Sequence, residues 1–372
     1  MKINVKKLLS LALVVGSIVM VIWIAFSNSE LKDAWKVLGS LDPVWVLGLF
    51  GCWFAYMFFD ALSGWIYLRS EGFRLSLGRA VNACLIGFYY SNITPSSAGG
   101  QPMQVNSLRR AGIPVGYGTM TATVRFVCNQ FAISMLSLVF WILNREFAAR
   151  QLGDAIWLAR IGWAINFAGV PLCLMAAFRR NLIQRIARGV IHLCHRIHLI
   201  RNEESALAST TNVLDTYHSA LLELSRRPGQ ILIQLVCSCL SMLGLISSIY
   251  FVYKAFGFSG TPWYQLLTIS FLLFISASYT PLPGASGAQE GGFLLYYKGL
   301  IPGDRIGLAL LVWRFFTYYL FLIVGVFVVV GEKILLSVEA RRKRRKEAAL
   351  KQAAERKASA PETPGGEEKQ DA

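Results

Sequence analysis

The chain has 372 residues, 55% of them hydrophobic, with a mean hydropathy of +0.48 and a formal net charge of +16. Several apolar runs approach the roughly 20 residues that a helix needs to cross a bilayer core of about 30 Å. This composition predicts an all-α polytopic membrane protein and excludes a β-barrel, whose strands alternate over short segments. The charge does not indicate nucleic-acid binding, because the basic residues lie in the loops that flank the apolar runs.

About six full transmembrane helices are expected. The first, 8–26, follows a basic start but lacks a small-residue cleavage site, so we expect a retained anchor and not a signal peptide. The other apolar runs are 43–68, 117–143, 155–178, 231–256 and 306–331. Most of the seven cysteines lie inside these runs, which predicts apolar packing residues and no disulfide framework.

The distribution of Lys and Arg sets the expected orientation. The basic segments are the N-terminus, 69–79, 109–110, 179–227 and the tail, which carries the run 341–346. Placing all of them on one side satisfies every loop. We therefore expect a multi-pass protein of the bacterial inner (plasma) membrane with both termini in the cytoplasm.

Two domains are expected, an integral membrane domain over 1–331 and a basic, largely disordered cytoplasmic tail over 332–372. Within the first, loop 179–228 has apolar and basic residues at helical spacing, which predicts an amphipathic helix on the anionic cytoplasmic leaflet. His192 and His195 in this loop lack further ligands at a suitable spacing, so no metal and no cofactor is expected.

One pattern occurs twice in the chain. Residues 91–101 read SNITPSSAGGQ, and residues 278–290 read SYTPLPGASGAQE. Each copy places a helix-breaking Thr-Pro and a glycine cluster inside apolar sequence. The helices before the breaks, 80–93 and 265–279, are too short to cross a bilayer, so each copy is expected to form a re-entrant, broken-helix hairpin.

The charge scheme places the two hairpins on opposite sides of the membrane. Three crossings separate them, so the first enters from the cytoplasm and the second from outside. This predicts an inverted repeat, with the first repeat at about 78–143 and the second at about 263–331.

Polar side chains surround both breaks. Because broken helices in a bilayer must face protein or a wet cavity, these side chains are candidates for substrate binding. The alternative is a packing kink, and the duplication favours binding. The candidates in the two hairpins are Asn92, Thr94, Gln101, Gln104, Thr280, Gln289 and Glu290.

Arg125 and Arg314 each lie near the middle of the apolar run that follows a hairpin. An unpaired arginine at that depth costs a few kcal/mol or more, and intramembrane charges usually have a function. A guanidinium suits a phosphate or carboxylate ligand. The alternative is a structural ion pair with Glu290 and, for the other arginine, with Asp60, and both roles can alternate.

At these motifs the sequence resembles the lysylphosphatidylglycerol synthase transmembrane family, also called flippase-like membrane proteins. The resemblance rests on 92–95 with 99–100, on 280–284 with Gly287 and Glu290, and on the two downstream arginines, and it covers about 6–333. It implies the membrane part of multiple-peptide-resistance proteins, which moves an aminoacylated phospholipid between leaflets. The soluble synthase domain of those proteins is not expected here, because the chain ends in a short basic tail. The first copy lacks the acidic residue of the second, which predicts unequal halves.

We therefore expect a lipid translocator that binds an anionic or aminoacylated phospholipid or an isoprenoid-linked head group in a polar pocket at the bilayer midplane. No catalytic constellation is recognisable, so no enzymatic activity is expected. The alternative is a non-transporting membrane scaffold, or a partner of a lipid-modifying enzyme that the tail and the 179–228 loop recruit.

Overall fold

A computed structural model describes Val19, residues 36–178 and 226–332, residues 334–335 and scattered residues between 184 and 222. Of the segments expected above, the 8–26 anchor, the 179–228 loop and the 332–372 tail lie wholly or largely outside this part. The chain divides into two compact units, Met1–Gly325 and Val326–Ala372. The described residues 326–332 of the second unit are helical, and the helices that hold the candidate site lie in the first.

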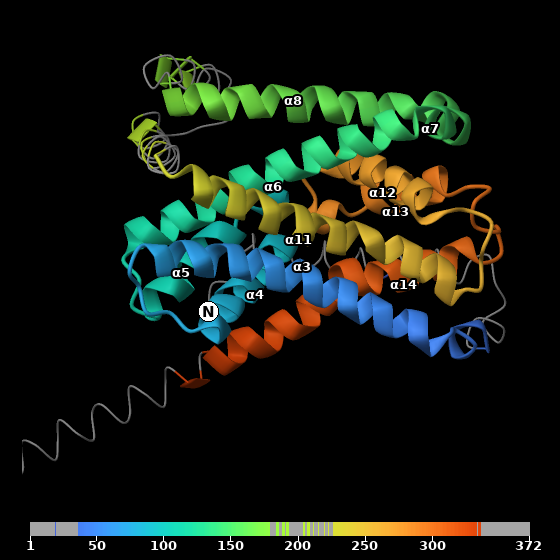
Figure 1. The fold of residues 1–372 in the computed structure, drawn as a ribbon, viewed down its shortest axis with the longest axis horizontal. Helices are drawn as coiled ribbons and strands as arrows, with labels where there is room; N and C mark the ends of the chain where they lie inside the picture. Colours follow the sequence, from blue (N-terminus) through green and yellow to red (C-terminus); the bar gives the residue numbers. More distant parts are fainter. Residues whose placement is uncertain are drawn as a thin grey trace, which may run out of the picture. The chain divides into compact units, whose positions relative to one another are not determined.

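The described residues of the first unit form helices joined by short turns, and no strand occurs among them (Figure 1). The 3₁₀ turns Pro95–Ser97 (η1) and Pro283–Ala285 (η3) interrupt the two hairpins, and a π-helical turn at Phe315–Tyr319 extends α14. The α-helices are α3 (Pro43–Ser70), α4 (Leu77–Ile93), α5 (Gly100–Arg110), α6 (Val115–Leu143), α7 (Arg145–Leu152), α8 (Ile156–Phe178), α11 (Pro228–Ala255), α12 (Trp263–Ala277), α13 (Ala288–Tyr296) and α14 (Ile306–Arg314).

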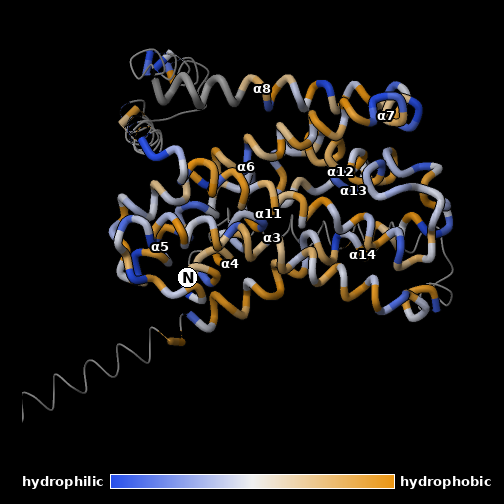
Figure 2. The backbone as a smooth tube through the Cα atoms, viewed as in Figure 1, coloured by the Kyte–Doolittle hydropathy of each residue, from blue (hydrophilic) through white to orange (hydrophobic). Residues whose placement is uncertain are grey.

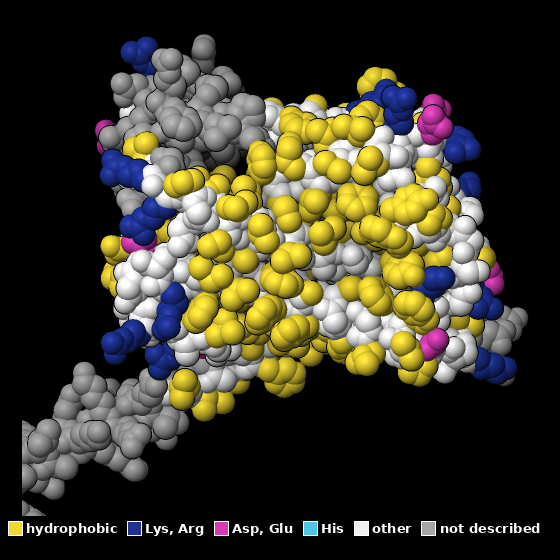
Figure 3. All heavy atoms as spheres, viewed as in Figure 1, with side chains coloured by type: hydrophobic (Ala, Val, Ile, Leu, Met, Phe, Trp, Pro, Cys, Tyr) yellow, Lys and Arg dark blue, Asp and Glu magenta, His cyan; other side chains and the backbone are white. Residues whose placement is uncertain are grey.

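Four helices of the described part are long and apolar enough to cross a membrane: Pro43–Ser70, Val115–Leu143, Pro228–Ala255 and Ile306–Glu332. Apolar residues occupy the middle of these helices and polar residues their ends (Figure 2). The surface repeats this pattern, with hydrophobic side chains over the middle of the face shown and Lys and Arg gathered toward its ends (Figure 3). The all-α polytopic membrane fold is confirmed, and the exact number of spans stays a prediction.

Helices α3 and α11 run antiparallel and fix the two ends of the bundle. Asp42 caps α3 by accepting a hydrogen bond from the Val44 N–H (2.9 Å), and its own N–H donates to the Ala255 carbonyl at the end of α11 (3.3 Å). At the opposite end, Arg227 and Glu71 form an ion pair with an N···O distance of 2.6 Å. These are called the Asp42 end and the Glu71 end below.

The first hairpin, α4–η1–α5, begins at the Glu71 end. The indole N–H of Trp65 donates to the Leu75 carbonyl (2.8 Å) just before α4, and the Phe73 ring contacts the Tyr117 ring at the start of α6. Helix α4 begins three residues earlier than expected, because Ser76 caps it with its side chain. Its 17 residues rise about 25 Å, which is less than a full crossing.

The second hairpin, α12–η3–α13, begins at the Asp42 end. The Thr261 N–H, just before α12, donates to the hydroxyl of Tyr253 near the end of α11 (3.2 Å). Where α13 ends, the Gln151 amide of α7 donates to the carbonyls of Tyr296 (3.2 Å) and Lys298 (2.8 Å). The two hairpins therefore enter the bundle from opposite ends, which can be followed from α5 and from α13 in Figure 1.

The tips of the two hairpins touch. The backbone N–H of Ser96 in η1 donates to the Pro281 carbonyl just before η3 (3.1 Å), and the Tyr318 hydroxyl donates to the Asn92 carbonyl (3.1 Å). Gly284 has a φ of +60°, and a Cβ there would lie 2.1 Å from the Tyr318 ring. Only glycine allows this turn to approach the ring so closely.

Candidate functional site

A cavity of about 530 Å³ lies where the hairpin tips meet α3, α6, α11 and α14. Its wall is a mixture of polar and aromatic side chains, and among the described residues Arg314 is the one charged member. The hydroxyl and amide residues in the wall are Ser91, Asn92, Ser96, Ser97, Gln130, Ser270, Ser278, Thr280, Gln289 and Thr317. The aromatic residues are Tyr56, Phe88, Phe126, Phe274, Tyr279, Trp313, Tyr318 and Phe321.

Arg314 is held in the wall by a buried network. Its Nε donates to Oε1 of Glu290 (2.7 Å), and its Nη2 donates to the Gly284 carbonyl in the second tip (3.1 Å). The other carboxylate oxygen of Glu290 accepts from the Gly287 N–H (2.6 Å), at the N-terminus of α13. The arginine therefore ties α14 to both the turn and the second helix of the hairpin.

The Arg314 guanidinium also lies among aromatic rings. Its Cζ is 5.0 Å from the Tyr318 ring centroid and 5.9 Å from that of Trp313. Both rings line the cavity, so a cation–π arrangement supports the charge from that side. The side chain is only 4% exposed, and its favourable contacts with a carboxylate, a carbonyl and two rings offset the cost of burial.

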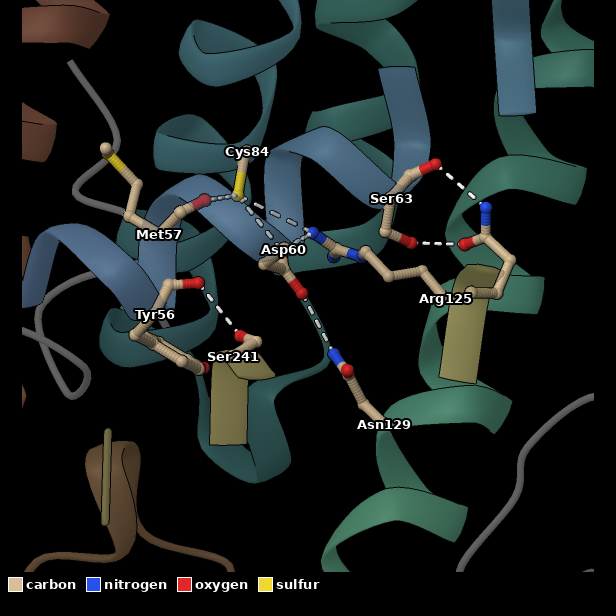
Figure 4. A network of polar contacts seen from close by, with 9 residues as sticks. Tyr56, Met57, Asp60, Ser63, Cys84, Arg125, Asn129 and Ser241 are labelled. Atoms are coloured by element: carbon tan, nitrogen blue, oxygen red, sulfur yellow. Dashed lines mark hydrogen bonds and ion pairs between the residues drawn. The ribbon is translucent and has the colours of Figure 1, made fainter. Parts of the chain in front are cut away.

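A second buried polar cluster lies beside α4 (Figure 4). Asp60 of α3 accepts hydrogen bonds from the Arg125 guanidinium, from the Asn129 amide (2.9 Å) and from the Cys84 thiol (3.0 Å). Arg125 does not line the cavity. Its guanidinium instead lies 6.0 Å from the ring of Phe88, which does.

The structure brings four of the sequence-predicted residues to the cavity: Asn92, Thr280, Gln289 and Arg314. Glu290 is fully buried and contacts the cavity only through Arg314. Asp60 pairs with Arg125, in a separate place.

Three other predicted residues are not in the cavity wall. The Thr94 hydroxyl donates to the Tyr90 carbonyl (2.6 Å) and accepts from the Gly99 N–H (2.9 Å), so it stabilises the first turn. Gln101 and Gln104 lie on α5 and do not line the cavity. The sequence predicted a binding role for these two glutamines because they follow the helix break. The cavity, however, lies on the side of the first tip that faces η3.

Sequence reasoning missed the cavity residues that lie outside the repeated motif. Gln130 of α6 and Tyr56 of α3 are examples. Gln130 bonds to Asn166 of α8, and the Tyr56 carbonyl accepts from the Ser241 hydroxyl of α11 (2.8 Å). An amide inside an apolar run such as Val115–Leu143 is itself a signal, since lipid cannot satisfy it.

Comparison with known proteins agrees with this architecture. The family described as the lysylphosphatidylglycerol synthase TM region matches residues 7–325. A UPF0104 membrane protein of Archaeoglobus fulgidus is 21% identical over 298 residues, which cover 80% of this chain and 89% of the relative. A UPF0104 membrane protein of Methanothermobacter thermautotrophicus is 22% identical over 311 residues, with 80% and 87% covered. The chain is thus a membrane protein that belongs to the lysylphosphatidylglycerol synthase TM-region family.

Proposed function

We propose that this protein is a lipid translocator, whose cavity binds the phosphate-bearing head group of a lipid while the acyl or isoprenoid chains stay in the bilayer. The observation that carries this proposal is the meeting of two hairpins from opposite ends at a cavity that contains Arg314. A guanidinium presents several N–H donors in a planar fork that suits phosphate oxygens.

The polar wall supports transport because its hydrogen-bonding side chains can replace the water molecules that hydrate a lipid head group. In the described wall, ten Ser, Thr, Asn and Gln side chains line a volume of about 530 Å³, which lies within the usual range of small-molecule sites. In the absence of such a wall, a phosphate at membrane depth would lose its hydration with little compensation. The wall therefore lowers the barrier that a head group meets between the leaflets.

The opposite entry of the hairpins also supports an inverted-repeat mechanism. In transporters of this kind, the site lies between two halves of opposite orientation, and rocking of the halves exposes it to each side in succession. Here the tips pack against each other, and within the described part a backbone hydrogen bond from the Ser96 N–H to the Pro281 carbonyl joins them. Rocking of the halves would break this bond and this packing, while the hydrogen bonds within each hairpin stay intact.

We place the protein in a bacterial inner membrane with both termini in the cytoplasm, since the Lys and Arg bias of the loops favours this orientation. We propose transport without a chemical step on the lipid. Arg314, the one charged residue in the described cavity wall, is already paired with Glu290, which leaves no free acid or base there.

Lipid scrambling in proteoliposomes tests the proposal. Purified full-length protein is reconstituted with a trace of fluorescent phosphatidylglycerol, and dithionite is added to bleach the outer leaflet. We expect bleaching to pass well beyond the half of the signal that protein-free liposomes lose. Bleaching that stops at half, across phosphatidylglycerol, phosphatidylinositol and a polyprenyl phosphate, would reject the proposal.

A truncation separates translocation from the scaffold alternative. Deleting residues 341–372 removes the basic run but none of the cavity residues. A translocator keeps its scrambling rate after this deletion. A scaffold loses its cellular function with the tail and scrambles no lipid in either form.

A further inference from the structure

We infer that the head group is polyhydroxylated, a sugar or cyclic polyol joined to the lipid phosphate, and that aminoacylated head groups are excluded. This inference rests on the proposed translocator function and specifies its substrate class. It follows from three properties of the cavity wall: its charge, its unpartnered polar atoms and its aromatic rings.

The charge of the wall disfavours a cationic head group. Its one charged residue in the described part is Arg314, and Glu290 behind it has no oxygen free. One oxygen accepts from Arg314 and the other from the Gly287 N–H. A free ammonium group on the head group would find a guanidinium and no open carboxylate, at a depth where charge repulsion is weakly screened.

Two buried side-chain atoms of residues that line the cavity have no hydrogen-bond partner among the described residues. They are Oε1 of Gln289, an acceptor, and Nε1 of Trp313, a donor. Gln289 is 5% exposed, so its orphaned oxygen costs free energy until a ligand supplies a donor. A hydroxyl group both donates and accepts, so it can pair with either kind of atom, the acceptor of Gln289 or the donor of Trp313.

The aromatic rings supply the third part of the match. Tyr56, Phe88 and Phe321 form a cluster with centroid separations of 4.8 to 5.5 Å, and all three line the cavity. Trp313 and Tyr318 also line the cavity, beside Arg314. Flat apolar faces suit the C–H surface of a sugar or inositol ring, while the hydroxyl and amide groups between them bind its rim.

Gln289 and Gln104 provide a matched pair of variants. Both are buried to 5% exposure, both have an orphaned Oε1, and each lies on the second helix of a hairpin. Only Gln289 lines the cavity. Replacing either by leucine removes a buried unpaired oxygen, so neither change is expected to unfold the protein.

The test compares two lipids in the same proteoliposomes. Phosphatidylinositol in the outer leaflet is measured by its cleavage with an inositol-specific phospholipase C, and lysyl-phosphatidylglycerol by an impermeant amine reagent. We expect phosphatidylinositol to cross faster by about tenfold or more, and Gln289→Leu to slow it by a similar factor. Gln104→Leu should leave its rate unchanged.

The outcomes separate the two proposals. If lysyl-phosphatidylglycerol crosses as fast as phosphatidylinositol, the head-group inference is wrong and the translocator function stands. The same holds for phosphatidylcholine, which tests whether the aromatic rings bind an ammonium group. Equal slowing by the two leucine variants also contradicts the inference, because the cavity oxygen would then have no special role. If no lipid crosses, both proposals fail.

Discussion

Replacing Arg314 by alanine should destabilise the protein by about 3–5 kcal/mol, the cost of leaving the buried carboxylate of Glu290 without its partner. The change also removes the donor to the Gly284 carbonyl, which holds the tip of the second hairpin. A thermal melt in detergent should show a large fall in Tm. Arg305→Ala is the control, since its contact with Asp304 is exposed and 3.7 Å long, and we expect almost no change there.

A double variant separates the structural role of the pair from lipid binding. Glu290→Gln together with Arg314→Gln removes both charges, and the glutamine oxygen at 290 can still accept from the Gly287 N–H. We expect most of the stability lost in Arg314→Ala to return, because the double variant leaves no buried charge without a partner. Scrambling should remain near the level of empty liposomes. A folded double variant that scrambles at the wild-type rate would show that Arg314 has only a structural role.

Joining the two hairpin tips covalently should stop lipid movement. The Ser96 N–H donates to the Pro281 carbonyl (N···O 3.1 Å), so the two backbones are in contact and these positions are the pair chosen for cysteines. If the halves must separate to admit a head group, Ser96→Cys with Pro281→Cys should lose scrambling after oxidation and regain it with a reductant.

The two single cysteine variants control for the loss of the proline and of the serine hydroxyl. They should scramble equally with and without oxidant, because one new cysteine cannot bridge the two tips. An effect of oxidant on the native cysteines would show in both single variants. The bridge in the double variant is verified by mass spectrometry. If the bridged protein scrambles as fast as the same protein after treatment with the reductant, the tips need not part.

The repeated motif made the hairpins predictable, because helix-breaking residues in apolar sequence have few structural meanings. Charge bias and the number of crossings predict entry from opposite faces of the membrane, and the inverted repeat stays a prediction. Within the bundle, the contacts at Trp65 and at Thr261 place the hairpin starts at the two ends. The sequence offered Glu290 and Asp60 as partners of the two arginines, but it could not supply which carboxylate pairs with which arginine. Asp60 lies 65 residues before Arg125, and only the packing of α3 on α6 and α4 brings them together.

The inequality of the two halves was predictable only in part. The first copy has no counterpart of Glu290, which the sequence shows, and Arg125 pairs instead with a residue outside its repeat. The result is that one arginine lines the cavity and the other lies behind Phe88. Which of the two would face the cavity depends on where the tips bend, and this follows from tertiary contacts such as the hydrogen bond between Ser96 and Pro281.

The central claim is that a lipid head group passes through the cavity between the tips, and filling that cavity tests it most directly. Thr280 lies in the wall, so Thr280→Trp places a large ring where the head group would bind. Val139 on α6 is 49% exposed and outside the wall, so Val139→Trp adds the same ring to the outer surface. The initial scrambling rate per folded protein is measured for both. We predict the rate of empty liposomes for Thr280→Trp and the wild-type rate for Val139→Trp; equal, wild-type rates for both variants would contradict the claim.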